Sequence, residues 1–355
     1  MLREVLRGVP GLTREMAART AQLVFRVYRW WGWLEERSDW RERMEAADAL
    51  AERFAREPAR FSEGALRKAV PDWIHEHMEV TPAWLRLLQE EPVLWLRGRP
   101  GQGPIVALEL GEASCPCPLV PEAVRYDGGQ DLFRSAMFQG GRIEVQDVAS
   151  QWVTLLAGPK AGESWWDACA GEGGKALHMA DLMDNRGVVW ATDRAEWRLK
   201  RLRMRVGRAG LFNVRWAVWE GGAKRPMTPR MDGVLVDAPC SGVGTWRRNP
   251  QARWTTTPRD VAELAGRQLA LLQGASRGVK PGGRLVYSVC TLTRAETTGV
   301  ARAFEAGNAA FEPLEWPVAA GAEPGPGRPN EAWFPSERWG GNGMYVAGWR
   351  RKEDA

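Results

Sequence analysis

The spacing of apolar residues divides the chain into three stretches of different character. From about Leu12 to Leu88, apolar side chains recur at helical spacing, with Arg and Glu between them. Thr13 stands in the N-cap position of the first run, and Ser38-Asp39 begins another. The pattern predicts a small helical domain over residues 1–90.

The second stretch covers residues 91–140 and has a less regular pattern. Short apolar runs such as Pro104 to Leu108 and Leu119 to Val124 are separated by Gly and Pro. Runs of this length, bounded by turn residues, are typical of short strands and helices. This stretch predicts a small α+β subdomain.

From residue 141 to residue 355, runs typical of buried strands alternate with amphipathic runs. The expected strands are 164–168, 187–192, 214–218, 233–236 and 284–287, and the expected helices are 175–183, 196–208 and 259–277. Such alternation indicates βαβ units, and so an α/β fold with a parallel, doubly wound sheet. Residues 317–342, rich in Gly and Pro, are expected to form a loop, and Met344 to Trp349 a closing strand.

The composition is ordinary for a globular protein, and the sequence predicts a cytoplasmic location. The chain has 355 residues, of which 44% are hydrophobic and 26% charged, and its net charge is +5. That mild excess permits a polyanionic partner without demanding one. Five cysteines, an odd and sparse number, argue against a disulfide framework, and no long apolar run indicates a membrane span. We therefore expect reduced thiols, a cytoplasmic location and no membrane partner. Nothing in the sequence indicates an obligate oligomer, so a monomer is expected.

A Gly-rich loop between a strand and a helix predicts a nucleoside site. It runs from Asp167 to Lys175, and Asp193 ends the next strand. That spacing is the one at which a carboxylate can accept from ribose hydroxyls. The loop lacks the phosphate cradle of ATP-binding proteins, and the carboxylate of Glu172 would repel a pyrophosphate. A ligand with ribose and adenine but no phosphates fits better, and S-adenosylmethionine is one.

Two cysteines follow neighbouring strands and suggest covalent chemistry. Cys240 lies in Asp237 to Gly242, and Cys290 lies in Tyr287 to Leu292. Methyl transfer to C5 of a pyrimidine needs a thiolate that adds to C6, because C5 alone is a poor nucleophile. Asp237 can contact N3 and the exocyclic amine of cytosine. A single buried cysteine is more often a small core residue, but two cysteines at strand ends beside Asp237 favour a catalytic role.

At these residues the chain resembles the RNA 5-methylcytosine methyltransferases of the RsmB/Fmu/Sun type, which are related to NusB-domain proteins. The resemblance covers residues 140 to 350. The matching motifs stand in the family's order: Val145 to Ser150, Asp167 to Lys175, Asp237 to Gly244 with Arg247 to Pro250, and Tyr287 to Leu292 with Glu296. It implies a Rossmann-like methyltransferase sheet over residues 141–355, preceded by a NusB-like RNA-binding domain and a ferredoxin-like subdomain.

The resemblance also implies roles for individual residues. Cys290 would be the nucleophile, Cys240 would assist release, and Asp237 would contact base and cofactor. The residues implied for S-adenosylmethionine are Cys169, Ala170, Gly171, Glu172, Gly173, Gly174, Lys175, Asp193, Glu220 and Asp237. Those implied for the substrate are Pro239, Arg247 and Arg248. The partner would be RNA, with small-subunit ribosomal RNA first.

Some residues depart from the family pattern and keep other functions open. Gly171-Glu172 replaces Ala-Pro, Glu220 replaces Asp, and Gly341 to Tyr345 replaces an Asp-Gly-Phe-Phe pattern. One alternative is therefore a non-catalytic RNA-binding or assembly factor on the same fold, in which Glu172 blocks the cofactor loop. Another is an enzyme that methylates DNA.

Three weaker patterns remain in the sequence. His75-Glu76-His77 and Cys115-Pro116-Cys117 lack further ligands, so no metal is expected. The basic helix over 196–208 is either a solvated face or a contact to the RNA backbone.

Overall fold

The computed structural model describes residues 9, 11–222, 225–316, 323–325, 328–334 and 336–353. They form two compact units. The first, the helical unit, is Met1–Pro92 with Thr245–Pro258, and the second, the catalytic unit, is Val93–Gly244 with Arg259–Ala355. The chain therefore leaves the catalytic unit once, for residues 245–258, and then returns to it. No helix among the described residues is long and apolar enough to cross a membrane.

The helical unit contains the helices that the N-terminal pattern predicts. Thr13 accepts a hydrogen bond from the N–H of Met16 and caps the first helix, and Asp39 caps the second by accepting from Arg41 and Glu42. The helices are α2 (Arg14–Arg29), α3 (Trp40–Arg56), α4 (Glu63–Leu66), α5 (Ile74–His77), α6 (Pro82–Leu87) and α12 (Ala252–Thr255).

A buried arginine ties residues 245–258 to the other helices of this unit. The guanidinium of Arg253 is fully buried and donates to the main-chain carbonyls of Ala69, Leu88 and Trp246. Trp254 donates from its ring N–H to the carbonyl of Tyr28. These bonds satisfy buried polar groups that would otherwise destabilise the fold.

The catalytic unit begins with a small antiparallel sheet whose strand order is β2-β3-β1-β4. Its strands are β1 (Leu94–Gly98), β2 (Ser114–Pro116), β3 (Ala123–Tyr126) and β4 (Ile143–Val145), and its helices are α7 (Gly103–Leu110) and α8 (Ala136–Gln139). This is the small α+β subdomain that the sequence predicts.

The large sheet confirms the Rossmann-like α/β fold, with one difference from the expectation. The strands β5 (Ser164–Asp167), β6 (Val188–Asp193), β7 (Val214–Val218), β8 (Met231–Asp237) and β9 (Val279–Val289) are parallel, in the order β9-β8-β5-β6-β7. The sheet is not parallel throughout, because β13 (Met344–Arg351) runs antiparallel to β9, and the short β10 (Phe311–Pro313) pairs with β13.

The expected loop over 317–342 is wrong for most of its length. The structure has β11 (Glu323–Gly325), β12 (Arg328–Phe334) and α15 (Ser336–Trp339) there, while residues 317–322 lie outside the described residues. Asn330 and Glu331 of β12 are buried, and Asn330 donates to Glu305 and to the carbonyl of Gly348. Buried polar residues hold this strand, so the apolar alternation that marks a strand is missing.

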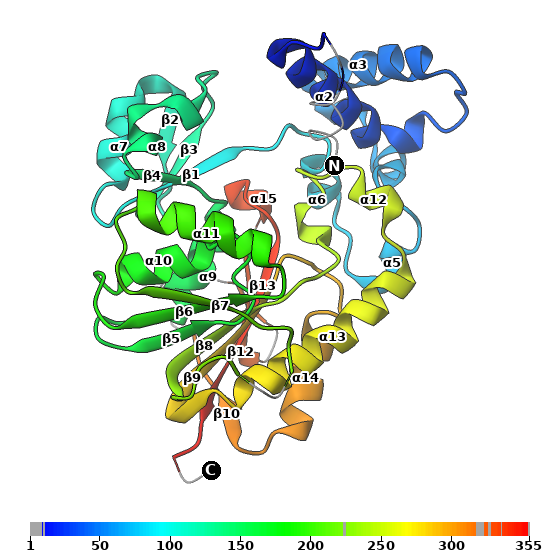
Figure 1. The fold of residues 1–355 in the computed structure, drawn as a ribbon. Coiled ribbons are helices and arrows are strands. Elements are labelled where there is room, and N and C mark those ends of the chain that lie inside the picture. The colour runs from blue at the N-terminus through cyan, green and yellow to red at the C-terminus, as the bar shows by residue number, and fades with distance from the viewer. Residues whose placement is uncertain are drawn as a thin grey trace. The chain divides into compact units, whose positions relative to one another are not determined.

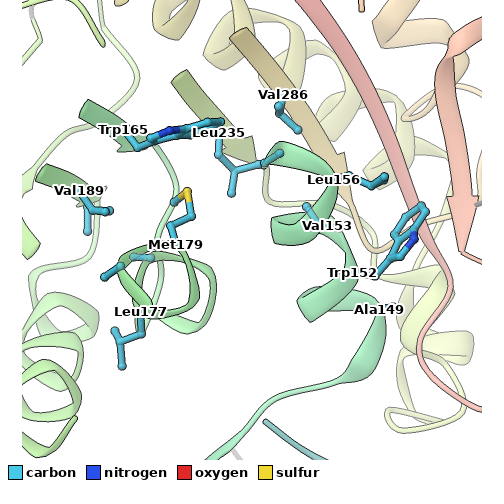
Figure 2. Packing of buried hydrophobic residues seen from close by; sticks show 14 of the residues in the cluster. Ala149, Trp152, Val153, Leu156, Trp165, Leu177, Met179, Val189, Leu235 and Val286 are labelled. Atoms are coloured by element: carbon cyan, nitrogen blue, oxygen red, sulfur yellow. The ribbon is translucent and has the colours of Figure 1, made fainter. Parts of the chain in front are cut away.

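Two helical layers cover the large sheet (Figure 1). The helices α9 (Val148–Ala157), α10 (Gly174–Leu182) and α11 (Glu196–Arg208) pack on one face, and α13 (Pro258–Ser276) and α14 (Thr298–Gly307) on the other. Successive strand residues point to opposite faces, so Trp165 belongs to the first core and Trp166 to the second. Figure 2 shows Trp165, Leu235 and Val286 facing α9 and α10. The carboxyl ends of the parallel strands remain free to form a site.

Candidate active site

The loop after β5 has a backbone that closely approaches its neighbours. Gly171 and Gly173 have φ angles of 56° and 88°, a conformation that side chains disfavour. A Cβ at Gly173 would lie 2.8 Å from side-chain atoms of Leu177 and Leu202. The N–H of Ala170 donates to the carbonyl of Thr192, which fixes the loop to β6. Position 173 therefore accepts only glycine.

Asp193 lies where the sequence predicts a partner for ribose. It ends β6, and its two carboxylate oxygens accept from the N–H groups of Gly171, at 3.0 Å, and Ala195, at 2.8 Å. A carboxylate has about four acceptor positions. The two N–H groups use two of them and Arg198 pairs with Oδ2 from 3.7 Å, so Oδ1 retains acceptor capacity for a ribose hydroxyl. The side chain is therefore oriented by the cofactor loop itself.

Asp167 is a site residue to which sequence reasoning assigned no role. It is fully buried at the end of β5, and neither carboxylate oxygen makes a hydrogen bond to the described residues. Burial, and then repulsion from Asp237, raise its pKa to about 8, against the opposing effects of Lys175 and the nearby N–H of Cys169. That N–H lies outside hydrogen-bonding geometry. An unpartnered buried carboxylate beside the Gly-rich loop fits a ligand with an ammonium group.

Lys175, Asp237 and Ser288 form a chain across the ends of β8 and β9. The Nζ of Lys175 donates to Oδ2 of Asp237 at 2.7 Å, and Oγ of Ser288 donates to Oδ1 at 2.7 Å. Burial lowers the pKa of Lys175, but the attraction and hydrogen bond of Asp237 outweigh it and raise the pKa overall. Lys175 thus stays charged and fixes the orientation of Asp237.

The two cysteines meet, as their positions after neighbouring strands predict. The Sγ atoms of Cys240 and Cys290 are 3.4 Å apart, and neither cysteine forms a disulfide. The hydrogen bond to Cys290, and then burial, raise the pKa of Cys240 well above its ordinary value. Cys240 therefore remains a thiol, in contact with the sulfur of Cys290.

A buried glutamate joins the two cysteine-bearing loops. Oε1 of Glu296 accepts from the N–H of Ser241 at 2.8 Å and from Gln268 at 2.9 Å. Oε2 accepts from the hydroxyls of Ser241, Thr291 and Thr293 at 2.5–3.1 Å. Ser241 follows Cys240 and Thr291 follows Cys290, so one carboxylate sets the position of both sulfurs. The sequence marks Glu296 only as the end of a motif.

The remaining predicted cofactor residues belong to the loop after β5, except Glu220, which follows β7. Glu172 pairs with Arg201 of α11 at 2.6 Å, which compensates the negative charge that replaces the family's proline. Burial, followed by repulsion from Asp167, raises the pKa of the Cys169 thiol well above its ordinary value. Glu220 follows β7 and is exposed. Ala170 and Gly174 are half-buried, so their backbone is accessible.

The predicted substrate residues have different surroundings. Pro239 is exposed beside Cys240, and its carbonyl accepts from Gln268 at 2.9 Å. Arg247 and Arg248 belong to the helical unit. Arg247 is buried there and donates to the carbonyl of Glu91 at 2.6 Å. The contact of these two arginines with substrate stays a prediction.

Gly341 to Gly343, which depart from the family pattern, lie just before β13, and Gly343 contacts the loop from Ala238 to Gly244 that carries Cys240. The N–H of Gly343 donates to the carbonyl of Gly244 at 2.9 Å, and that of Asn342 donates to Asp147 at 3.1 Å. A Cβ at Gly343 would lie within 3.0–3.2 Å of Leu292 and Gly244. Glycine at 343 therefore allows the two loops to approach.

No group of three or more potential metal ligands was found in the described part of the chain. His75-Glu76-His77 belongs to the helical unit and Cys115-Pro116-Cys117 to the catalytic unit. Cys117 is buried and Cys115 is exposed.

Comparison with known proteins connects this geometry to one family. A family model described as 16S rRNA methyltransferase RsmB/F matches residues 153–350. A probable ribosomal RNA small subunit methyltransferase B from Synechocystis is 36% identical over 265 residues, which cover 69% of this chain and 59% of that protein. The corresponding protein of Bacillus subtilis is 39% identical over 178 residues, covering 50% of this chain and 40% of its own.

A solved structure has the same arrangement. The structure of a methyltransferase homologue from Pyrococcus horikoshii is 26% identical, with a TM-score of 0.66, and the match covers 76% of this chain and 90% of the other. The aligned residues span about 60% or less of the length of the two curated relatives.

Proposed function

Because the chain belongs to the 16S rRNA methyltransferase RsmB/F family, whose methyl donor is S-adenosylmethionine, we propose that it methylates C5 of cytosine in RNA. We propose small-subunit ribosomal RNA as the substrate. The observation that carries the proposal is the pair of sulfurs 3.4 Å apart beside Asp237. This chemistry needs one thiolate to form a bond to the base and a second group to help break it.

The proposed reaction begins at Cys290. Its thiolate adds to C6 of the cytosine, and the electron pair of the C5–C6 double bond becomes available at C5. C5 then takes up the methyl group that bound S-adenosylmethionine would supply. The C5 proton passes to solvent water, the C5–C6 double bond re-forms, and the bond between C6 and Cys290 breaks to release the thiolate. Cys240, held as a thiol by its raised pKa, assists this release, and Asp237 contacts N3 and the exocyclic amine.

The cofactor residues of this chain fit S-adenosylmethionine, which supplies the methyl group. Asp167 offers an unpartnered buried carboxylate for the ammonium group of the methionine moiety, and Asp193 retains acceptor capacity for a ribose hydroxyl. The backbone from Cys169 to Lys175 lines the space between them. Glu220, exposed after β7, is proposed to lie near the adenine.

Transfer of labelled methyl from S-adenosylmethionine to unmodified total RNA tests the proposal. We expect label in RNA, at C5 of cytosine after nuclease digestion, with the unaltered protein and none with Cys290→Ala. Cys115→Ala is the matched control, because Cys115 is an exposed free cysteine outside the site. Label in DNA rather than RNA, or full activity in Cys290→Ala, would contradict the proposal.

The alternative of a non-catalytic RNA-binding or assembly factor was based on the altered first motif, which contains Glu172, and on Asn342. Since Glu172 forms an ion pair with Arg201, its charge is compensated, and the first of these two observations is weakened. Binding of S-adenosylmethionine separates the two functions, because a factor with a blocked loop would bind none.

A further inference from the structure

Beside the cofactor loop, on the outer side of α11, the catalytic unit has a cavity of about 440 Å³. Its walls come from α11, from the small sheet and from the loop itself. Phe133, Phe138 and Met204 give it apolar walls, and Arg201, Arg205 and Arg208 give it a cationic side. Figure 1 shows α11 on the same side of the large sheet as the small subdomain that supplies the two phenylalanines. The volume lies within the range of small-ligand pockets, ~300–1,000 Å³.

The apolar side chains at this cavity face solvent. Met204 is 74% exposed and Phe133 is 51% exposed, and Trp197, about two turns before Met204 and outside the cavity lining, is 53% exposed. Trp197, Arg201, Met204 and Arg208 occupy positions i, i+4, i+7 and i+11 of α11, so they lie along one face of the helix. Aromatic, guanidinium and thioether groups therefore follow one another along a stripe that is exposed at Trp197, Arg201 and Met204 and half-buried at Arg208.

Two of the arginines are fixed and shape the cavity. Arg205 and Arg208 pair with the buried carboxylate of Glu144 at 2.9 and 2.5 Å. The guanidinium of Arg208 also lies 3.8 Å from the ring centre of Phe138, which covers one face of that ring. Phe138 is thus a wall, while the ring of Phe133, 4.9 Å away in a T-shaped contact, keeps a free surface.

Other cations on α11 are available to an anion. The guanidinium of Arg201 has five N–H donors and donates from one nitrogen to Glu172 at 2.6 Å, so it can also bind a phosphate while the ion pair with Glu172 remains. Lys200 pairs only loosely with Glu196, at 3.6 Å. A stacking surface bordered by cations that can still bind phosphate matches the chemistry of single-stranded nucleic acid.

We propose that this cavity binds an unpaired nucleobase of the RNA strand, outside the target cytosine, by stacking on Phe133 and Met204. Arg201 and Lys200 contact the phosphates on either side. The inference rests on the proposed function and deepens it, because it assigns a second contact to the same RNA. Charge complementarity selects RNA over a protein helix, since the apolar surface is interrupted at each turn by a cation.

Binding of a fluorescein-labelled oligouridine 12-mer, followed by anisotropy, tests the cavity directly. The double variant Phe133→Ala/Met204→Ala is expected to bind the 12-mer about 10-fold more weakly, because base stacking on an aromatic contributes about 1–3 kcal/mol. Phe133→Tyr should retain the affinity and Phe133→Leu should lose most of it, which separates stacking from apolar contact. Phe212→Ala is the control, since Phe212 is 78% exposed and does not line the cavity.

Methyl transfer keeps this inference distinct from the proposed function. With unmodified ribosomal RNA, the double variant should have a raised KM and nearly unchanged kcat. Equal affinity of the double variant and the unaltered protein for the 12-mer, with unchanged KM, would overturn the inference, although the methyltransferase proposal would stand. Weaker 12-mer binding by the variant, in a protein that transfers no methyl to any RNA, would support the cavity and refute the proposed activity.

Discussion

Replacing Asp167 with asparagine separates the effect of the buried carboxylate on folding from its effect on ligand binding. Burial raises the pKa of Asp167 from an ordinary value of 3.8 to about 8. A carboxyl group with a raised folded-state pKa contributes stability that is fully present below pH 3.8 and is lost as the pH rises through 8. Asparagine stays neutral, so the variant loses none of that stability as the pH rises.

The expected difference follows from the shift. Between pH 5 and pH 8, the free energy of unfolding of the cofactor-free protein should fall relative to Asp167→Asn by ~1.4 kcal/mol per pH unit, or ~4 kcal/mol in total. Urea denaturation of both proteins at pH 5, 6, 7 and 8, monitored by tryptophan fluorescence, measures it. A difference between the two proteins that does not change with pH would refute the raised pKa.

The affinity for S-adenosylmethionine should rise with pH, whereas the free energy of unfolding falls. At pH 7, a group with a pKa of about 8 is roughly nine-tenths protonated. An ammonium group bound beside it favours the ionised form, so binding should release about 0.9 proton at pH 7, and affinity should rise between pH 6 and pH 7. Calorimetry in buffers of different ionisation enthalpy counts the protons. Asp167→Asn should bind S-adenosylmethionine more weakly and release none, and proton release equal to that of the unaltered protein would contradict the assignment.

Three further substitutions test the site. Cys240→Ala should accumulate a covalent protein–RNA adduct, visible as a retarded band in a denaturing gel, because addition through Cys290 proceeds while release stalls; absence of the band would count against the roles of the two sulfurs. Asp193→Ala should weaken cofactor binding, since it removes the acceptor for the ribose and the anchor of the loop at Gly171, and unchanged affinity in calorimetry would show that the ribose lies elsewhere. Glu296→Gln should lower methyl transfer about 30-fold, or ~2 kcal/mol, because hydrogen bonds to a charged acceptor become neutral ones; activity equal to that of the unaltered protein would exclude a positioning role.

The features that the sequence predicts are those set by neighbours along the chain. The helix over 196–208 has the expected bounds because its apolar spacing is local. The approach of Cys240 and Cys290 follows from their places after two buried strands, since parallel strands end at the same edge. Both inferences need no knowledge of tertiary contacts.

The features that it does not predict depend on partners distant in the sequence. Glu296 binds Ser241 from 55 residues away, and no local pattern marks such a contact. The strand over 328–334 is held by buried polar groups and therefore lacks apolar alternation. The isolation of Asp167 is visible only when all its neighbours are in place.

Because residues 245–258 belong to the helical unit, neither unit is encoded by one continuous segment of the chain. A truncation that begins at Val93 would remove the carbonyls of Ala69 and Leu88 that Arg253 binds, and would leave a buried guanidinium and the ring of Trp246 without their surroundings. Trp246 and Arg253 follow Cys240 by 6 and 13 residues in the sequence. An exchange of the helical unit between relatives therefore has to carry residues 245–258 together with the N-terminal segment.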